Sequence, residues 1–407
     1  MIKKTRININ SSLKVYIKVL LSFILNEGEK NEITFKKNLK SFFSTDNILI
    51  SSQGRVAAYN IFKVILSDKQ KEILISPYTL TEVINAIIYA GGKPVYVEIN
   101  LQTGLPSEDD LDKKINDKTA GLVITHLYSN KEDILNFHRK YNKKIKIVED
   151  TAIHLGAKVD HKKFLGTIFD YGFYSFGVMK NLCTFHGGAI YSKDKIKLKE
   201  IENNLNKNTE YSLISSIKLL FFCMLIDIAY SKYIFNFFTF YVLKFSFKKI
   251  DQVIYPGVYP KLFQIKPKHY NYKFQKNFAI AGIENLKILQ SKMNNRIQKV
   301  KLYELYLNKG LAINHFSFYE INSFIEYQIL LKKNKNKFLS KELLKIGYDI
   351  RHTWYVNSVR FLNLNFNIKD FPNSEQLHES VLSLPVHNKI LEEDIKKICN
   401  LINFYES

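Results

Sequence analysis

Short apolar runs alternate with amphipathic stretches from about residue 48 to residue 193. The stretches between the runs, such as 56–66, 82–90 and 131–141, repeat their apolar positions with the period of a helix. Repeated strand–helix–strand units predict an α/β fold with a mostly parallel sheet, whose ligands bind at the carboxyl ends of the strands. The runs predicted to be strands are NILISS (47–52), EILISP (72–77), KPVYVEI (93–99), GLVITH (121–126), KIKIVED (144–150), FYSF (173–176) and GGAIYS (187–192).

The segment 212–247 breaks this rhythm because it is strongly apolar and aromatic. Its longest uncharged run, between Lys232 and Lys244, is shorter than the ~18–20 residues that a membrane-spanning helix needs. We therefore expect no transmembrane helix here. Two interpretations stay open: the segment docks on the cytoplasmic face of an anionic membrane, or it packs against the protein's own core or a dimer partner.

The pattern predicts three parts of the chain. Residues 1–46 form an amphipathic segment, residues 47–265 form a large α/β domain that includes an apolar insertion at 205–250, and residues 266–407 form a smaller α+β domain. We expect no signal peptide, because Lys14 and Lys18 interrupt the first apolar patch and no small-residue cleavage site follows it.

Composition narrows the class of protein. The chain has 407 residues, of which 46% are hydrophobic and 14% aromatic, so disorder, a disulfide mini-protein and a collagen-like fibre are excluded. The net charge of +22 indicates either an anionic partner or the codon bias of an AT-rich genome. No dense block of Lys and Arg stands out, so we expect no nucleic-acid partner.

The cysteines Cys183, Cys223 and Cys399 are too widely spaced for a disulfide framework or a paired-cysteine metal site. We expect no metal ion, and we take the reducing cytoplasm as the default location.

Three segments carry chemistry when they are considered together. KIKIVED ends a buried strand with Asp150, YSFGVMKNL places Ser175 at a strand end and Lys180 just beyond it, and SSQGRVAA places Gly54 at a strand-to-helix turn. Such a turn favours a phosphate, because free backbone N–H groups and the helix dipole face it. An amine, a carboxylate and a phosphate site are what pyridoxal phosphate (PLP) requires.

Each signal also has a structural explanation. Asp150 could cap the next helix, Lys180 could be one of many surface lysines, Ser175 could be a strand-end hydroxyl and Gly54 a turn glycine. Their order and spacing along the chain favour the functional interpretation.

The sequence resembles the DegT/DnrJ/StrS-type sugar aminotransferases, which are PLP enzymes of fold type I. The resemblance runs through most of the chain outside the first 45 or so residues and the 195–265 region. The similar segments are PYTLTEVINAIIYAGGKPVYVEI, ITHLYSNKEDI, VEDTAIHLGA, FLGTIFDYGFYSFGVMKNLCTFHGGAIYS, HYNYKFQKNFAIAGIENL and SVLSLPVHNKILEEDIKKI.

The resemblance implies roles for individual residues. It makes Lys180 the Schiff-base lysine and Asp150 the partner of the pyridine nitrogen. The implied cofactor-binding residues are Gly54, Arg55, Val56, Ser175, Leu80 at the ring-stacking position and, from the other subunit of a homodimer, Asn271. The implied substrate-side residues are His126, Tyr128, Arg351 and His352.

The chain departs from the family pattern at several positions. Ile153 stands where relatives commonly have Gln or His, and His186 stands in the loop where they have Gly-Glu-Gly-Gly. Leu80 replaces the stacking aromatic residue, with Tyr78 as a substitute nearby, and Lys273 replaces an Arg. These changes leave the cofactor assignment in place and leave the substrate open.

By resemblance, the chain transfers an amino group from an amino acid, glutamate, to a nucleotide-linked keto-sugar used for surface polysaccharide or lipopolysaccharide. Sugar dehydratases of the same fold replace the lysine with His, and Lys180 is present here. Two alternatives stay open: an aminotransferase for a lipid-linked or non-sugar ketone at the inner membrane face, and a noncatalytic membrane-associated scaffold.

Overall fold

The computed structural model describes residues 3–6, 12–160, 163–249, 265–308, 310, 322–333, 335–351 and 355–407. Its centre is a seven-stranded sheet with the order β1-β8-β7-β6-β5-β2-β4, and every neighbouring pair from β7 to β4 is parallel. Strand β8 is antiparallel to both β7 and β1. The strands are β1 (Ile48–Ser51), β2 (Glu72–Ile75), β4 (Lys93–Tyr96), β5 (Thr119–Thr125), β6 (Ile147–Asp150), β7 (Tyr171–Ser175) and β8 (Gly188–Ser192).

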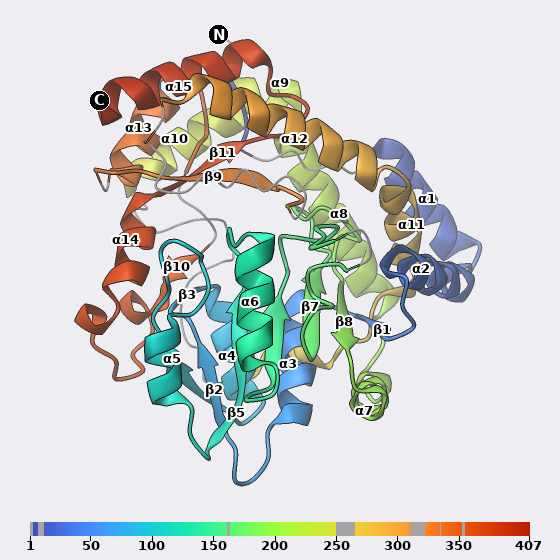
Figure 1. Ribbon diagram of the computed structural model, residues 1–407. Coiled ribbons are helices and arrows are strands. Elements are labelled where there is room, and N and C mark those ends of the chain that lie inside the picture. The colour runs from blue at the N-terminus through green and yellow to red at the C-terminus, as the bar shows by residue number, and fades with distance from the viewer. Residues whose placement is uncertain are drawn as a thin grey trace.

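Helices cover both faces of this sheet (Figure 1). Ile73 and Ile75 of β2 pack with α3 (Gly54–Ile65) and α4 (Thr81–Tyr89) on one face. Leu74, between them, packs with α5 (Glu108–Lys114) and α6 (Lys131–Tyr141) on the other. Successive side chains of a strand point to opposite faces, so a strand buried on both faces is apolar throughout. The prediction of a mostly parallel α/β sheet is confirmed.

A second, smaller sheet lies in the C-terminal part of the chain. Strands β9 (Glu326–Leu330) and β11 (Val381–Pro385) pair antiparallel, with Val381 opposite Leu330. The predicted α+β character of this region is confirmed. The helices of this region and its neighbours are α11 (Ala279–Lys287), α12 (Leu289–Tyr306), α13 (Asn336–Lys345), α14 (Pro372–Ser380) and α15 (Glu392–Glu406).

Short elements connect the two sheets. Strand β10 (Val356–Asn357) pairs with β3 (Tyr78–Thr79), which follows β2 in the chain. The remaining short helices are η2 (Lys268–Asn271), η3 (Lys276–Phe278), η4 (Ser358–Arg360) and η5 (Ile368–Asp370). Helix α7 (Lys195–Asn206) follows β8 and packs on α3.

The N-terminal segment is helical from residue 13 and packs closely on the rest of the chain. It contains α1 (Leu13–Ile24) and α2 (Gly28–Phe43), and both helices contact α11. A Cβ atom on Gly282 of α11 would lie 2.5 Å from the ring of Phe35 in α2, so this contact requires a glycine. The domain limits at 46 and 265 stay a prediction.

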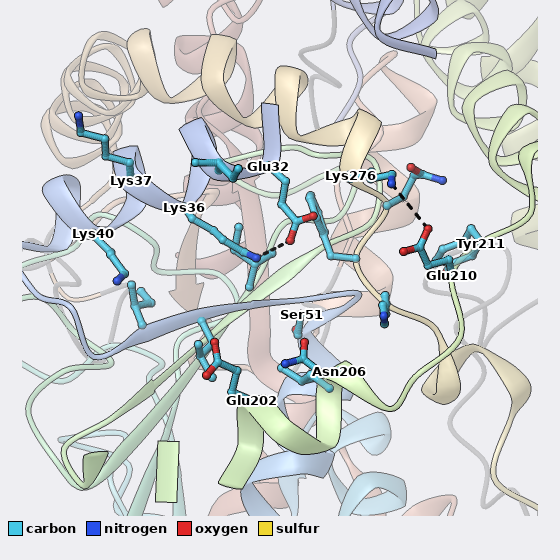
Figure 2. A pocket seen from close by; sticks show the side chains of 18 residues that line it. Glu32, Lys36, Lys37, Lys40, Ser51, Glu202, Asn206, Glu210, Tyr211 and Lys276 are labelled. Carbon is cyan, nitrogen blue, oxygen red and sulfur yellow. Dashed lines mark ion pairs between the residues drawn. The ribbon is translucent and has the colours of Figure 1, made fainter. Parts of the chain in front are cut away.

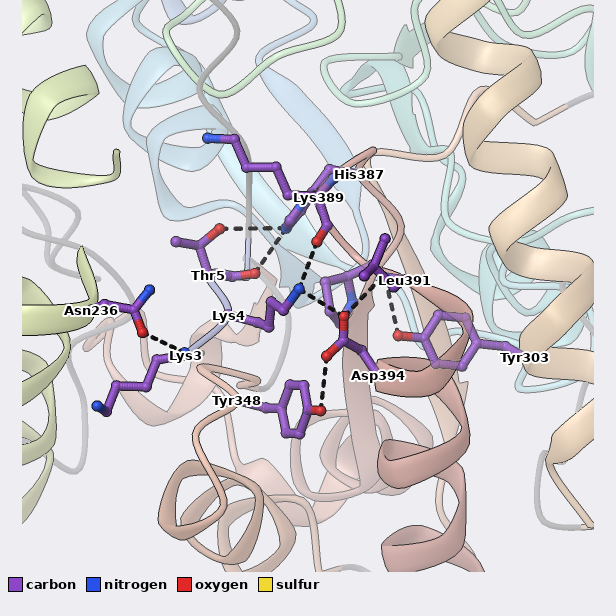
Figure 3. A network of polar contacts seen from close by, with 11 residues as sticks. Lys3, Lys4, Thr5, Asn236, Tyr303, Tyr348, His387, Lys389, Leu391 and Asp394 are labelled. Atoms are coloured by element: carbon purple, nitrogen blue, oxygen red, sulfur yellow. Dashed lines mark hydrogen bonds and ion pairs between the residues drawn. The ribbon is translucent and has the colours of Figure 1, made fainter. Parts of the chain in front are cut away.

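Residues 3–6 lie against the C-terminal part of the chain (Figure 3). The Lys4 N–H donates to the carbonyl of Gly347 at 2.9 Å, and the Lys4 carbonyl accepts from the Asp349 N–H at 3.0 Å. Arg6 and Glu326 form a bidentate ion pair in which both side chains are only 2% exposed. Two elements about 320 positions apart are thereby joined.

The apolar insertion forms α8 (Leu213–Ala229), α9 (Lys232–Ile234), the π-helix η1 (Phe235–Thr239) and α10 (Phe240–Lys249). Within the described ranges, no single helix has the length and hydropathy needed to cross a membrane. One pair, Leu213–Ala229 with Lys232–Phe245, meets that test only when its two helices are combined, and they are bent by 59°.

Candidate active site

The carboxyl ends of three strands meet at one edge of the large sheet. Ser51 of β1 and Ser175 of β7 are both paired with Gly188, so these two strand ends lie on either side of one glycine. Asp150, the last residue of β6, is paired with Phe173 of β7. The register therefore brings the predicted carboxylate and the predicted serine to the same edge.

Glycines allow the start of α3 to approach the end of β7. A Cβ atom on Gly54 would lie 2.9 Å from the Cβ of Ser175, which is shorter than real contacts of this kind. A Cβ atom on Gly188 would lie 2.8 Å from the backbone N of Gly54. The first N–H groups of a helix lack partners within the helix, so α3 presents them at this edge.

A cavity of about 230 Å³ lies at this edge. It brings together six of the residues to which the sequence analysis gave a catalytic or cofactor-binding role, from four separate segments of the chain: Gly54, Arg55, Leu80, Asp150, Ser175 and Lys180.

Asp150 lines this cavity and is buried, with 2% of its surface exposed. Burial raises the pKa of its carboxyl to about 6, while the Ala152 N–H, which donates to Oδ1 at 3.0 Å, and the nearby Lys180 favour the charged form. A carboxylate in this environment has a strong need for a positive partner.

Lys180 lines the same cavity in the loop after β7. Burial lowers the pKa of its amine to about 8, and the charges of Asp150, Glu326 and Glu82 oppose that shift only in part. An amine with a pKa near 8 is neutral in a substantial fraction of molecules at physiological pH, and a neutral amine is nucleophilic.

Several cavity residues were not predicted. Glu82 in the first turn of α4 is buried and pairs with Arg55 at 3.7 Å, and the buried Tyr355 also lines the cavity. Gln53, also not predicted, lines the cavity and lies 3.2 Å from the ring of His186, a residue that the sequence analysis had named. Tyr355 follows the predicted substrate residues Arg351 and His352 closely in the chain, whereas Glu82 carried no signal beyond a helix start.

The departures from the family pattern have definite positions. Ile153 and His186 both line the cavity, and burial lowers the pKa of the His186 ring to about 4. Leu80 lines the cavity as well, whereas Tyr78 is fully buried against Tyr355, with ring centroids 6.1 Å apart.

The three predicted substrate residues that the structure describes, His126, Tyr128 and Arg351, are not part of the lining of this cavity. His126 is buried, with Nε2 2.9 Å from Oε1 of Glu149. The Tyr128 hydroxyl donates to the Leu101 carbonyl at 2.9 Å, and Arg351 Nε donates to Asp349 at 2.8 Å. His352 lies outside the described residues. Their roles in substrate binding stay a prediction.

Two predicted cofactor residues also lie outside the lining. Val56 is buried in the first turn of α3, so only its backbone could face a phosphate. Asn271 is exposed, and its carbonyl accepts a hydrogen bond from the Thr209 N–H at 2.8 Å. An exposed position is what a contribution to another subunit's site requires.

A larger cavity, of about 450 Å³, lies beside β1 between α2, α7 and the segment 273–276. Figure 2 shows its charged side chains, among which Glu32 pairs with Lys36, and Lys276 lies 3.9 Å from Glu210. Neither Asp150 nor Lys180 lines it, so the smaller cavity is the candidate active site. Across the described ranges, no group of three or more His, Cys, Asp or Glu side chains could hold a metal ion.

The residues around the smaller cavity fit PLP. Lys180 supplies an amine, Asp150 a buried carboxylate and α3 a helix start held against Ser175 by the absence of a side chain at Gly54. In chemical type, such groups would suit the aldehyde, the pyridine nitrogen and the phosphate of that cofactor.

The fold and this site define a class, the PLP-dependent aminotransferases. The aminotransferase PseC of Helicobacter pylori, involved in the biosynthesis of pseudaminic acid, has the same fold, with a TM-score of 0.74 over 99% of both chains at 17% sequence identity.

The chain belongs to the DegT/DnrJ/EryC1/StrS aminotransferase family, whose sequence profile matches residues 9–210 and 249–403. It is therefore a transaminase that uses PLP. It is 26% identical over 388 residues to the uncharacterized protein MJ1066 of Methanocaldococcus jannaschii, and the matched region covers 92% of this chain and 88% of that protein. It is 23% identical over 401 residues to UDP-4-amino-4,6-dideoxy-N-acetyl-beta-L-altrosamine transaminase of Campylobacter jejuni, and the matched region covers 95% of this chain and 92% of that enzyme.

Proposed function

We propose that this aminotransferase moves an amino group from glutamate to the keto carbon of a nucleotide-linked sugar. The proposal rests on one observation, that Lys180, Asp150 and the turn at Gly54 line the same cavity. The Campylobacter jejuni relative supports the acceptor class, because its name specifies a UDP-linked amino sugar.

Lys180 holds the cofactor's aldehyde carbon through its Nζ and later moves a proton. When bound, PLP supplies an electron sink for the carbanion that forms at the α-carbon of the amino donor. The amine of Lys180 would be the group that takes the proton from that α-carbon and moves it during the transfer. Its pKa of about 8 suits both steps, because proton transfer is most efficient when the pKa lies near the working pH.

Asp150 holds the proton on the pyridine nitrogen. Its burial at the end of β6 leaves the carboxylate with few other partners, and the Ala152 N–H fixes Oδ1 in position at 3.0 Å. A preorganised charge in a buried site stabilises a charged transition state more strongly than the same charge in water.

The start of α3 binds the phosphate with the backbone N–H groups of Gly54, Arg55 and Val56, together with the hydroxyl of Ser175. Asn271 of the partner subunit completes this site in a homodimer. The exposed position of Asn271, away from the lining of its own cavity, supports this arrangement.

The product is an amino sugar attached to a nucleotide, which a cytoplasmic glycosyltransferase would consume in making a surface polysaccharide or lipopolysaccharide. The described cysteines are all unpaired and buried, which agrees with a reducing compartment.

The test is a transfer assay with purified enzyme, PLP, glutamate and a panel of nucleotide-linked 4-keto and 3-keto sugars. We expect 2-oxoglutarate and one amino sugar in equal amounts, identified by mass spectrometry, and no product from a Lys180→Ala variant. Failure with every nucleotide-linked sugar, combined with transfer to a lipid-linked ketone, would overturn the acceptor class. If glutamate gives no product while another amino acid does, glutamate is not the amino donor.

A further inference from the structure

Helix α8 has an apolar side that no described part of the chain covers. Only Ser216, Leu220 and Cys223 of this helix are buried, and they form a narrow strip that faces the protein. The opposite side carries exposed Ile214, Ile217, Phe221, Leu225 and Ile228. Their spacing of three, four, four and three residues places them in one stripe along the helix.

Helix α1 extends this apolar side. Its Val15 and Val19 pack in the same cluster as Leu220 and Cys223 of α8, and the Tyr16 hydroxyl is hydrogen-bonded to Asp227. With that face turned toward the protein, α1 exposes a second stripe of Leu13, Ile17, Leu20 and Ile24. Figure 1 shows α1 at the outer edge of the molecule, and the contacts of Val15, Val19 and Tyr16 place it against α8.

The second half of the insertion is anchored in the same way. Phe235 and Phe240 are buried against Leu344 of α13, and the Asn236 side chain accepts a hydrogen bond from the Lys3 N–H at 2.6 Å (Figure 3). The neighbouring Phe237 and Phe238 point outward and are 80% and 66% exposed. Phe245 of α10 is 68% exposed. The insertion is thus a fixed part of the fold that turns large aromatic rings to the solvent.

We propose that these exposed sides of α1, α8, η1 and α10, which we name the docking surface, rest on the headgroup region of an anionic lipid bilayer. The neighbouring helices α1 and α8 each expose an apolar stripe, and large exposed apolar patches mark interaction sites. The inference is independent of which ketone the enzyme aminates.

Charge favours lipid as the occupant. The exposed charged side chains on α1, α8 and the adjoining α9 are Lys14, Lys218 and Lys232, whereas Asp227 of α8 is half-buried against Tyr16. A two-fold contact between copies would pair two surfaces that both carry these lysines and no exposed acidic side chain, so neither surface would supply a countercharge. Anionic headgroups supply that countercharge, and the chain's net charge of +22 adds to the attraction.

The place of the insertion relative to the family match, and the shape of its helices, agree with a membrane-docking role. Residues 211–248 fall between the two ranges that match the family, so the insertion is not the surface that family members share. The bent helix pair is too short in each half to span a bilayer, and a helix with one apolar side lies in the plane of the interface instead.

The test is flotation of the full-length, PLP-loaded enzyme with vesicles. We expect the enzyme to float with vesicles of phosphatidylglycerol and phosphatidylcholine and to float less with phosphatidylcholine alone. The variant Phe237→Ser/Phe238→Ser/Phe245→Ser should lower the partition coefficient at least about tenfold, because each ring contributes a large apolar area. Lys14→Glu/Lys218→Glu/Lys232→Glu should abolish the preference for phosphatidylglycerol.

A matched control replaces exposed apolar residues on other helices. Ile196→Ser/Leu305→Ser/Phe404→Ser should float as the unaltered enzyme does. Bound-cofactor absorbance and thermal unfolding establish that each variant is folded. The proposal is overturned if the unaltered enzyme does not float or if the phenylalanine variant floats equally well. It is also overturned if the phenylalanine substitutions change only the oligomeric mass that sedimentation measures without lipid.

Discussion

Replacing Gly54 with alanine tests the phosphate end of the cavity with a single methyl group. The added Cβ would lie 2.9 Å from the Cβ of Ser175 and 3.2 Å from its Cα. Carbon atoms in contact prefer about 3.5–4.0 Å, so the start of α3 and the end of β7 have to move apart by roughly half an ångström or more. We expect weaker PLP binding, because that movement opens the site that holds the phosphate.

The size of the effect follows from the cost of overpacking. One extra methyl group in a closely packed site costs about 1–3 kcal/mol. If the strain is relieved only when the cofactor is absent, the whole cost falls on binding, and the affinity for PLP drops about 5- to 150-fold. If the strain persists without cofactor, the same cost lowers the free energy of unfolding.

Two measurements separate these cases. Titration of the cofactor-free protein with PLP, followed by absorbance, gives the affinity, and urea unfolding of the cofactor-free protein gives the stability. Together the two losses should amount to about 1–3 kcal/mol.

Gly177→Ala is the matched control. Gly177 lines the same cavity, but a Cβ there would meet nothing closer than Ser175 Oγ at 3.8 Å and Lys180 Cγ at 3.9 Å. Neither Gly54 nor Gly177 has a positive φ angle, so backbone strain is the same in both variants. The reasoning is refuted if Gly54→Ala binds PLP and unfolds as the unaltered protein does, or if Gly177→Ala is equally damaging.

Four further predictions concern single groups. Lys180→Ala should still bind PLP but lose the attachment that borohydride reduces, as mass spectrometry of the reduced protein would show; a reducible adduct in this variant would remove Lys180 from its role. The pKa of Lys180 is lowered from 10.5 to about 8, so between these pH values the unfolded chain binds more protons than the folded protein. The cofactor-free protein should therefore gain stability as the pH rises from 8 to 10. Urea unfolding should show that gain, and Lys180→Met should eliminate it. Asp150→Asn should reduce kcat by orders of magnitude with PLP still bound, since it removes the charge opposite the pyridine nitrogen; a near-normal kcat would contradict this. Arg6→Met should cost about 3–5 kcal/mol in urea unfolding because it leaves Glu326 buried and unpaired, and adding Glu326→Met should restore most of that loss.

The sheet was predictable because its pattern is local. Ile73, Leu74 and Ile75 are all apolar because alternate side chains enter opposite cores, and that arrangement needs no knowledge of the rest of the chain. Each predicted strand was therefore found where an apolar run occurs. The meeting of Asp150 with Lys180 was also predictable, because parallel strands place their carboxyl ends at one edge.

The direction of individual side chains was not predictable in the same way. Phe235 and Phe237 are both phenylalanines two positions apart, yet the first is 1% exposed and the second is 80% exposed. His126 and Tyr128 follow a strand at the correct edge, but their hydrogen bonds to Glu149 and Leu101 hold them outside the cavity lining.

The amino-acid sequence by itself determined the strands, the order of the cofactor-binding segments and the family, since these depend on neighbouring residues. Only the tertiary structure decided that Gly54 must lack a side chain, because Ser175 approaches it from a distant strand. Only the tertiary structure paired Arg6 with Glu326, which are 320 positions apart. Such contacts depend on how closely the folded chain brings two distant segments together, and no local pattern of polar and apolar residues encodes that distance.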